Sequence, residues 1–339
     1  MIKRYGKPVD IMRFKRSMMD RDRMNSIIAG NEKFGKFVVE GAGSEKISSC
    51  PICGSEDKGL GPVIYGIGYS ICSSCGMYYA NLRLAEGELK NYYTQDAGYS
   101  KTSYADVETY RYRAQEISSP KIDFVSELIK APGRRWLDIG SGIGDVVYNL
   151  RSRGFHARGL ELSEESIRFS KEMFGVDLEN KGISDVLKEE GPGSFDVVSY
   201  FGVLEHMADP LKQVGYASEL LSPGGLLVLE VPNAGSFSVI GDSFFTDSVV
   251  RQMTPFLHIM LFSQRSLTVL ADKFGLKAEG MWFIGLDMYN LLLHLGVKVP
   301  GFLESEVCRR MLDLNNELQE IFDKKEMSDQ ILFVARKAA

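Results

Sequence analysis

From about residue 134 to its C-terminal end, the chain alternates between short apolar segments and amphipathic segments. This alternation restricts the possible folds more than any other feature. Runs of apolar and β-branched residues predict strands at 135–139, 156–161, 195–200, 226–231, 278–284 and 330–336. Apolar residues at helical spacing predict helices at 145–153, 164–174, 211–221 and 264–274. Strands and helices in this order build a parallel sheet covered by helices on both faces, so the sequence predicts an α/β fold.

Length and composition are those of an ordinary globular protein. The 339 residues fit about two domains, and an apolar fraction of 44% supplies a large core. The net charge of -5 argues against binding to nucleic acid through global positive charge. Residues 1–23 lack the apolar segment of a signal peptide, and the apolar stretch 281–297 is short for a membrane span of about 20 residues. We therefore expect a cytoplasmic protein with no membrane span, while its oligomeric state is not indicated.

A glycine-rich turn, residues 140–144, joins the first predicted strand to the helix that follows. Glycines allow a tight turn and a close approach of the backbone to a ligand. The dinucleotide fingerprint G-x-G-x-x-G would require Gly or Ala at the position of Asp145. Asp138 precedes the turn, and Glu161 ends the second predicted strand, where a carboxylate can accept the hydroxyl groups of a ribose. These residues predict a nucleoside-containing ligand.

Four segments in the order 136–144, 159–163, 194–210 and 220–227 resemble motifs of the class I S-adenosylmethionine-dependent methyltransferases. The resemblance implies a Rossmann-like, seven-stranded sheet over residues 121–339, with a helical insertion at about 286–328, and S-adenosyl-L-methionine as cofactor. It places the following residues at the cofactor: Asp138, Gly140, Ser141, Gly142, Gly144, Glu161, Leu162, Asp185 and Tyr200. Many relatives read the adenine with an acidic residue after the third strand, and here either Asp185, from a shifted position, or a backbone amide takes that role.

Two histidines are candidates for catalysis. Methyl transfer needs a general base when the acceptor must lose a proton, and a histidine with its ordinary pKa near 6.5 suits that task. His206 follows the fourth of the family's strands, although the Glu205-His206 pair could instead orient the next helix. His258 lies on the loop after the fifth strand, where relatives that methylate small metabolites often carry a histidine facing the acceptor. A buried structural histidine is the alternative at that position.

Four of the five cysteines form two C-x2-C pairs, Cys50 with Cys53 and Cys72 with Cys75. The spacing is typical of a four-cysteine zinc site, because each tight turn offers two thiolates to a tetrahedral metal. We predict a structural zinc ribbon at residues 49–80, with redox-active cysteine pairs as the alternative. The ribbon could stabilise its own module, help to bind the acceptor, or hold RNA.

The remaining N-terminal segments are less specific. Residues 1–48 are basic, and Ile11, Phe14 and Met18 at helical spacing predict an amphipathic helix that packs on the body or contacts an anionic partner. Residues 81–120 are rich in tyrosine and are expected to form a helical linker. Within it, residues 91–104 are the favoured lid over the active site, with packing between modules as the alternative.

Together these features predict a methyltransferase with a zinc ribbon that acts on a small-molecule acceptor. The best guess for the acceptor is a sugar or a polysaccharide precursor. One alternative is an RNA methyltransferase that binds RNA through the ribbon, although the acidic net charge makes nucleic acid a disfavoured partner. Another is a non-catalytic zinc-ribbon adaptor with a vestigial methyltransferase fold. The sequence leaves C-, N- and O-methylation open.

Overall fold

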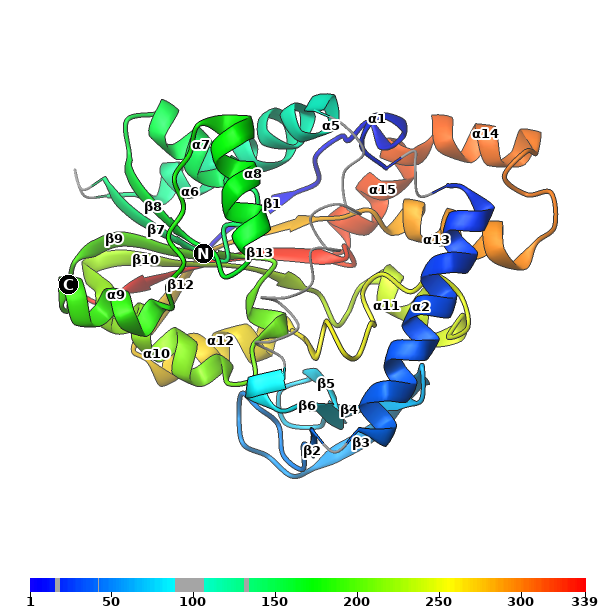
Figure 1. The fold of residues 1–339 in the computed structure, drawn as a ribbon, viewed down its shortest axis with the longest axis horizontal. Helices are drawn as coiled ribbons and strands as arrows, with labels where there is room; N and C mark the ends of the chain where they lie inside the picture. The colour runs from blue at the N-terminus through cyan, green and yellow to red at the C-terminus, as the bar shows by residue number, and fades with distance from the viewer. Residues whose placement is uncertain (16–18, 42, 89–106, 131–133) are drawn as a thin grey trace.

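The computed structural model describes the whole chain except residues 16–18, 42, 89–106 and 131–133. Its centre is a seven-stranded sheet in the order β1-β12-β13-β10-β9-β7-β8 (Figure 1). The strands of this sheet are β1 (Ile2–Tyr5), β7 (Arg135–Ile139), β8 (His156–Leu160), β9 (Phe195–Phe201), β10 (Leu221–Pro232), β12 (Leu276–Ile284) and β13 (Gln330–Lys337). Neighbouring strands are parallel except where β13 pairs antiparallel with β10 and β12. The predicted α/β fold with a mostly parallel, seven-stranded sheet is confirmed.

The central strands are apolar on both faces, as strands covered from both sides require. In β7, the side chain of Trp136 belongs to one core cluster and that of Leu137 to the other. Each cluster is closed by its own layer of helices (Figure 1). One face carries α6 (Ser119–Leu128), α7 (Asp145–Ser152) and α8 (Glu164–Phe174). The other face carries α9 (Ile183–Glu190), α10 (Pro210–Leu220) and α12 (Gln264–Lys273).

One strand of the sheet comes from the N-terminal segment. β1 pairs in parallel with β12, with Ile2 opposite Gly280 and Tyr5 opposite Phe283. Helical spacing predicts only a helix in residues 1–48, and the structure does place helices there, α1 (Ile11–Lys15) and α2 (Arg21–Glu40). β1 was not predicted because it lies at the edge of the sheet and buries little apolar surface, so its sequence lacks the apolar run typical of a strand. Ile2, for example, is half exposed. Met18 lies outside the described residues.

At the opposite edge, the segment after α8 contributes very little to the sheet. Instead of a third strand beside β8, it forms an isolated bridge between Leu160 and Glu179. Because this bridge replaces a strand, strands β7 to β13 contribute only six members to the main sheet, and β1 is the seventh.

A small β module lies beside α10 and α12 (Figure 1). Its main sheet has the order β11-β5-β4-β3, and a second pair joins β2 to β6. The bounds are β2 (Ser44–Lys46), β3 (Lys58–Ile64), β4 (Ile67–Cys72), β5 (Tyr78–Ala80), β6 (Leu82–Leu84) and β11 (Met260–Leu261). β11 belongs to the loop that follows β10. The main body therefore contributes one strand to the four-stranded sheet of the module.

The remaining helices surround the carboxyl edge of the main sheet. They are α5 (Val107–Tyr112), the π-helical turn η2 (Arg113–Ser118), the 3-10 turn η3 (Leu204–His206), α11 (Phe237–Phe244), α13 (Asp287–Lys298), α14 (Glu306–Asp313) and α15 (Asn315–Lys324). Tyr110 and Tyr112 of α5 are buried and pack against Phe169 and Phe14. The predicted lid at 91–104 lies outside the described residues. Among the described helices, none has the length and apolar character needed to cross a membrane.

Candidate functional site

The glycine-rich turn connects β7 to α7 at the carboxyl edge of the sheet. Gly140, Gly142 and Gly144 all have left-handed φ angles, of 66°, 52° and 77°. A Cβ atom at Gly144 would lie 2.1 Å from the Ser170 hydroxyl oxygen, so both the backbone angle and the packing require glycine there. A Cβ at Gly142 would meet no atom within 4 Å, which means that this glycine borders open space. The turn therefore packs against the protein at Gly144 and borders open space at Gly142.

Asp138 lies beneath this turn as part of a buried hydrogen-bond chain. The Ser199 hydroxyl donates to the Asp138 carboxylate at 2.6 Å and accepts from the Trp136 indole at 2.8 Å. The Ser141 hydroxyl donates to the Asp138 carbonyl oxygen at 3.0 Å. Burial raises the pKa of Asp138 to about 7. Asp138 and Ser141 thus fix the base of the turn.

Glu161 joins the turn to the end of β8. Its carboxylate accepts hydrogen bonds from the backbone N–H groups of Gly142, Leu162 and Ser163, each at 2.8 Å. Burial raises the pKa of this carboxyl group, while the three N–H donors oppose that effect. The structure therefore brings Glu161 and Leu162, both predicted from the sequence, to the glycine turn.

Two other predicted cofactor residues lie in different settings. Asp185 is half exposed in the first turn of α9, where its carboxylate accepts from the Gly182 N–H at 3.3 Å and pairs with Lys188 at 3.5 Å. Tyr200 is fully buried, and its hydroxyl donates to the Gln213 carbonyl oxygen in α10 at 3.1 Å. The Tyr200 side chain therefore points into the core, and only its backbone at the end of β9 can face a ligand.

His206 and His258 form a pair of neighbouring rings, with centroids 5.0 Å apart. His206 Nδ1 lies 2.8 Å from the Leu257 carbonyl oxygen, and His258 Nδ1 lies 2.9 Å from the Gln252 carbonyl oxygen. Because a carbonyl oxygen only accepts, the Nδ1 of His258 carries a proton, and the Nε2 of the neutral His258 ring keeps a lone pair that can accept another. Burial lowers the pKa of His258 to about 4 and that of His206, which also feels His258, to about 3. Both rings are neutral bases at pH 7.

Glu205 completes this group, although the sequence analysis assigns it only a helix-orienting role. Its side chain is 2% exposed, and its Oε1 lies 3.8 Å from His206 Nε2. Its Oε2 is buried without a hydrogen-bond partner among the described residues. Burial raises the pKa of Glu205 to about 8, so the group is a protonated donor at neutral pH. One ligand atom from each of Glu205, His206 and His258 lies within 4.8 Å of the others.

A cavity of about 270 Å³ opens beside the histidine pair, at the ends of β9, β10 and β12. Ligands in open α/β sheets bind at this carboxyl edge. Its lining includes both histidines, Glu205 and several charged side chains that sequence reasoning missed: Lys7, Lys15, Arg113, Lys121, Glu230, Arg251 and Asp329. Of these residues, only Arg251 could have been suspected from the sequence, because it lies seven positions before His258 on the same loop. The other charged residues come from distant segments that only the fold brings together.

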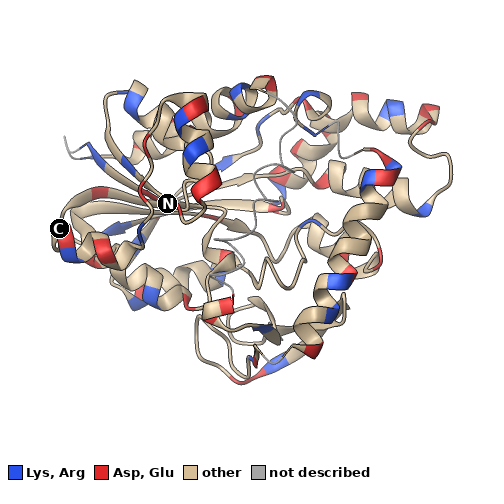
Figure 2. Ribbon diagram, viewed as in Figure 1, with Lys and Arg blue, Asp and Glu red and all other residues tan. Residues whose placement is uncertain are grey.

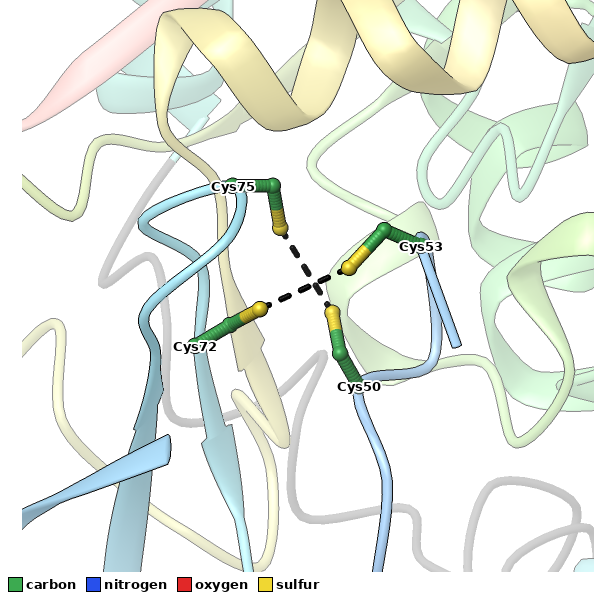
Figure 3. Close-up of side chains that lie close together, drawn as sticks. All are labelled: Cys50, Cys53, Cys72 and Cys75. Carbon is green, nitrogen blue, oxygen red and sulfur yellow. Dashed lines mark hydrogen bonds between the residues drawn. The ribbon is translucent and has the colours of Figure 1, made fainter. Parts of the chain in front are cut away.

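The four paired cysteines converge on a common point in the β module (Figure 3). Cys50 and Cys75 sulfurs are 3.6 Å apart, and Cys53 and Cys72 sulfurs are 3.4 Å apart. A tetrahedral zinc with bonds of about 2.3 Å separates its sulfur ligands by about 3.8 Å, so the observed spacing fits such an ion. The hydrogen bond between the Cys50 and Cys75 thiols lowers the pKa of Cys50 and raises that of Cys75, so the pair shares a proton. Cys308 is buried in α14, apart from this group.

The cysteine module contacts the loop that carries His258. The Tyr69 hydroxyl donates to the His258 carbonyl oxygen at 2.8 Å, and the Ala80 N–H donates to the Ile259 carbonyl oxygen at 2.9 Å. The Ser263 hydroxyl donates to the Cys75 carbonyl oxygen at 2.5 Å, next to a cysteine of the cluster. Strand pairing of Met260 with Tyr79 lies between these contacts. The loop is thus fixed to the module on both sides of β11.

A protein-family model described as a methyltransferase domain matches residues 110–279. A curated relative, the ubiquinone biosynthesis O-methyltransferase of Dechloromonas aromatica (strain RCB), is 31% identical over 148 residues. That match spans 41% of this chain and 62% of the relative, so the chain covers less than two thirds of this relative's length. The ubiquinone biosynthesis O-methyltransferase of Pseudomonas aeruginosa (strain UCBPP-PA14) is 29% identical over 187 residues, which are 53% of this chain and 79% of the relative.

Among solved structures, a SAM-dependent methyltransferase from Archaeoglobus fulgidus aligns with a TM-score of 0.45 and 17% identity. The alignment covers 68% of this chain and 97% of the other.

Proposed function

The chain belongs to the methyltransferase-domain family and is an S-adenosylmethionine-dependent methyltransferase, and from this premise we propose that it methylates a hydroxyl oxygen of a small metabolite. The observation that carries the proposal is the neutral histidine pair beside the cavity, because a hydroxyl oxygen must lose its proton when it is methylated and a neutral imidazole can accept that proton. The names of the curated relatives, which are O-methyltransferases, support the same choice. A sugar or polysaccharide-precursor hydroxyl remains our prediction within this class.

The glycine turn and its surroundings fit S-adenosyl-L-methionine. We propose that the backbone of Gly140, Ser141, Gly142 and Gly144 borders the cofactor on the open side of the turn, above Asp138. The Glu161 carboxylate, with Leu162 beside it, accepts the ribose hydroxyls. Asp185 or a neighbouring backbone amide reads the adenine, and the backbone at Tyr200 closes the site. The bound cofactor supplies a methyl group already activated on a sulfonium.

His258 is the proposed general base. Its Nδ1 proton is committed to the Gln252 carbonyl oxygen, so Nε2 receives the proton that the acceptor hydroxyl loses as its oxygen attacks the methyl carbon. The cofactor, when bound, would supply the methyl group and keep the electron pair of the carbon–sulfur bond on its sulfur. We propose that His206 positions His258 by holding the Leu257 carbonyl oxygen, one residue before the base. Alignment of the two reactants and exclusion of water supply the rest of the rate enhancement.

We propose that the four-cysteine cluster binds one structural zinc ion. Zinc would hold the turns that carry Cys50, Cys53, Cys72 and Cys75, and a module of this size depends on metal for folding. Because the module fixes the loop on both sides of β11, zinc would also hold His258 in place. This role needs neither acceptor nor RNA contact by the ribbon.

RNA methylation is the less supported alternative. Four of the basic residues that kept it open are paired with carboxylates of the body: Lys3 with Glu326, Arg4 with Glu127, Lys7 with Glu116 and Arg13 with Glu108. Helix α2 carries both positive and negative side chains (Figure 2). Such mixed charge favours packing over phosphate binding.

The test is methyl transfer from labelled S-adenosylmethionine to two pools, a metabolite extract and total RNA. We expect label in the metabolite pool as a methyl ether, identified by mass spectrometry. Label found only in RNA would overturn the proposed acceptor class.

A further inference from the structure

A buried carboxylate of α11, Asp242, holds the loop that carries His258. Its side chain is fully buried, and its Oδ2 accepts hydrogen bonds from the backbone N–H groups of Gln252 at 2.9 Å and Met253 at 3.0 Å. A hydrogen bond from an N–H group to a carboxylate is about twice as strong as one between neutral groups. Asp242 therefore fixes two successive backbone amides shortly before His258 in the chain.

One peptide group connects this carboxylate to the proposed base. The Gln252 carbonyl and the Met253 N–H belong to the same peptide unit, which is planar and trans. Its N–H end donates to Asp242, and its carbonyl end accepts from Nδ1 of His258 at 2.9 Å. The two ends of a trans peptide point in opposite directions, so the carboxylate and the imidazole bind opposite ends of one rigid unit. An acceptor on the N–H also polarises the carbonyl, which strengthens its hydrogen bond to the imidazole.

The other oxygen of Asp242 is held by α13. Oδ1 accepts from the side-chain amide of Asn290 at 2.9 Å and lies 3.0 Å from Nε2 of His294. Both of these side chains are buried. Because contacts at both oxygens fix the plane of the carboxylate, it cannot rotate away from the peptide group. Asp242 is thus a fixed point in the core from which the loop is oriented.

The charge of Asp242 also acts on His258. Burial lowers the pKa of His258 to about 4, and the negative charge of Asp242 acts in the opposite direction. When Nε2 accepts the proton of the acceptor hydroxyl, the ring becomes an imidazolium, and a carboxylate on its Nδ1 side stabilises that positive charge. The hydrogen bond at Nδ1 also keeps the lone pair on Nε2, which is the tautomer that the proposed reaction needs.

We infer that Asp242 is a positioning residue of the reaction: through the peptide group between Gln252 and Met253, it orients the imidazole of His258 and stabilises its protonated form. The inference rests on the proposed function, since it takes His258 as the general base. It gives Asp242 the part that a buried aspartate plays when it binds a catalytic histidine directly, here with a peptide group between the two side chains.

The first measurement is made on the wild-type full chain by nitrogen NMR of isotope-labelled histidines at pH 7, with His258→Ala to assign the signal. We expect His258 to be protonated on Nδ1 and unprotonated on Nε2. The opposite tautomer would overturn the inference, because Nδ1 would then not donate to the peptide group. This measurement needs neither an acceptor nor a folded variant at position 242.

The second measurement is the rate of label transfer from saturating S-adenosylmethionine to the metabolite extract. An asparagine at position 242 has one carbonyl oxygen and no charge, so it cannot accept from the peptide group and from α13 together. We expect Asp242→Asn to lower the rate by about fivefold or more, while S-adenosylmethionine affinity stays within about twofold. In a His258→Ala background the same substitution should lower the rate by less than about twofold, because Asp242 acts through His258.

Asp323→Asn is the matched control, because Asp323 is also buried and accepts hydrogen bonds from Gln319 and Ser328, outside the loop of His258. It should keep the wild-type rate. Equal losses in Asp242→Asn and Asp323→Asn would overturn the inference, as would an undiminished loss from Asp242→Asn in the His258→Ala background. Failure of the proposed function is a different result: His258 then shows the expected tautomer, but the wild type transfers no label to the extract.

Discussion

Burial sets the protonation state of the three titratable side chains at the centre of the site. It keeps His206 and His258 neutral and Glu205 protonated at pH 7. The base is therefore available without a neighbouring carboxylate to activate it, and the carboxyl group is available as a donor. The pH dependence of activity should report the protonation of His258, and the pH dependence of stability should report that of Glu205.

For His258, we expect kcat/KM to be independent of this group between about pH 5 and pH 8. The base form is lost only as the pH falls through about 4, because burial places the pKa there and the nearby charges of Arg251 and Asp242 oppose each other. The measurement is a pH profile of kcat/KM, with circular dichroism at each pH as the control for folding. An acid limb with a midpoint near 6.5 would assign the base to a less buried group.

For Glu205, we expect Glu205→Gln to stabilise the protein more at pH 8 than at pH 5. The folded-state pKa is raised from an unfolded value of about 4.3, so wild-type stability falls as the pH rises from about 4 to about 8. Glutamine does not ionise and escapes this loss, which is on the order of a few kcal/mol for a fully buried group. Thermal unfolding at the two pH values measures the difference. An equal shift of Tm at both would mean that Glu205 is not held protonated.

Among single residues, those that could be predicted from the sequence are the ones whose type and spacing alone indicate a turn or a metal site. The glycines at 140, 142 and 144 and the two C-x2-C pairs are of this kind. Sequence reasoning missed Glu205 as part of the site, because neither the sequence position nor the residue type reveals burial. Lys15 and Arg251 were missed because they come to line the same cavity only in the folded chain.

Among the elements, helix α8 and strand β7 have the bounds predicted from the sequence, because capping residues mark the ends of α8 and a short, mostly apolar segment marks β7. Ser163 accepts from the Ser166 N–H at the start of α8, and Gly175 ends it in a left-handed conformation. β1 was missed because an edge strand has little apolar surface to bury. β11 has two residues and depends on its partner β5, so no local pattern could predict it.

The pairing of β5 with β11 leads to a prediction about the cysteine module. Cys75→Ser should reduce bound zinc well below one ion per chain and accelerate hydrogen exchange at residues 258–262, because the module holds this loop. We expect turnover to fall at least tenfold while cofactor affinity stays within about twofold. Elemental analysis, hydrogen exchange and isothermal titration measure the three effects.

Cys308→Ser is the matched control, since Cys308 is also buried but lies in α14. It should keep both the zinc and the slow exchange. If Cys75→Ser loses zinc but residues 258–262 exchange as in wild type, the module does not position His258.

For the molecule as a whole, the N-terminal segment, the cysteine module and the main body, which lie apart in the sequence, all contribute to the cavity or to the loop beside it. The N-terminal segment adds β1 to the main sheet and Lys15 to the cavity, and the cysteine module holds the loop of His258. The glycine turn and the cavity lie along the same carboxyl edge but use different residues. Binding of cofactor and transfer of the methyl group should therefore be separable by substitution.

The most direct test measures cofactor affinity and turnover side by side for Glu161→Ala and His258→Ala. We predict that Glu161→Ala weakens S-adenosylmethionine binding by tenfold or more, because it removes the carboxylate at the glycine turn. His258→Ala should keep cofactor affinity within about twofold and lower kcat by about 10²–10⁴-fold, the range of a lost general base. Unchanged turnover in His258→Ala, or unchanged cofactor affinity in Glu161→Ala, would contradict this account of the site.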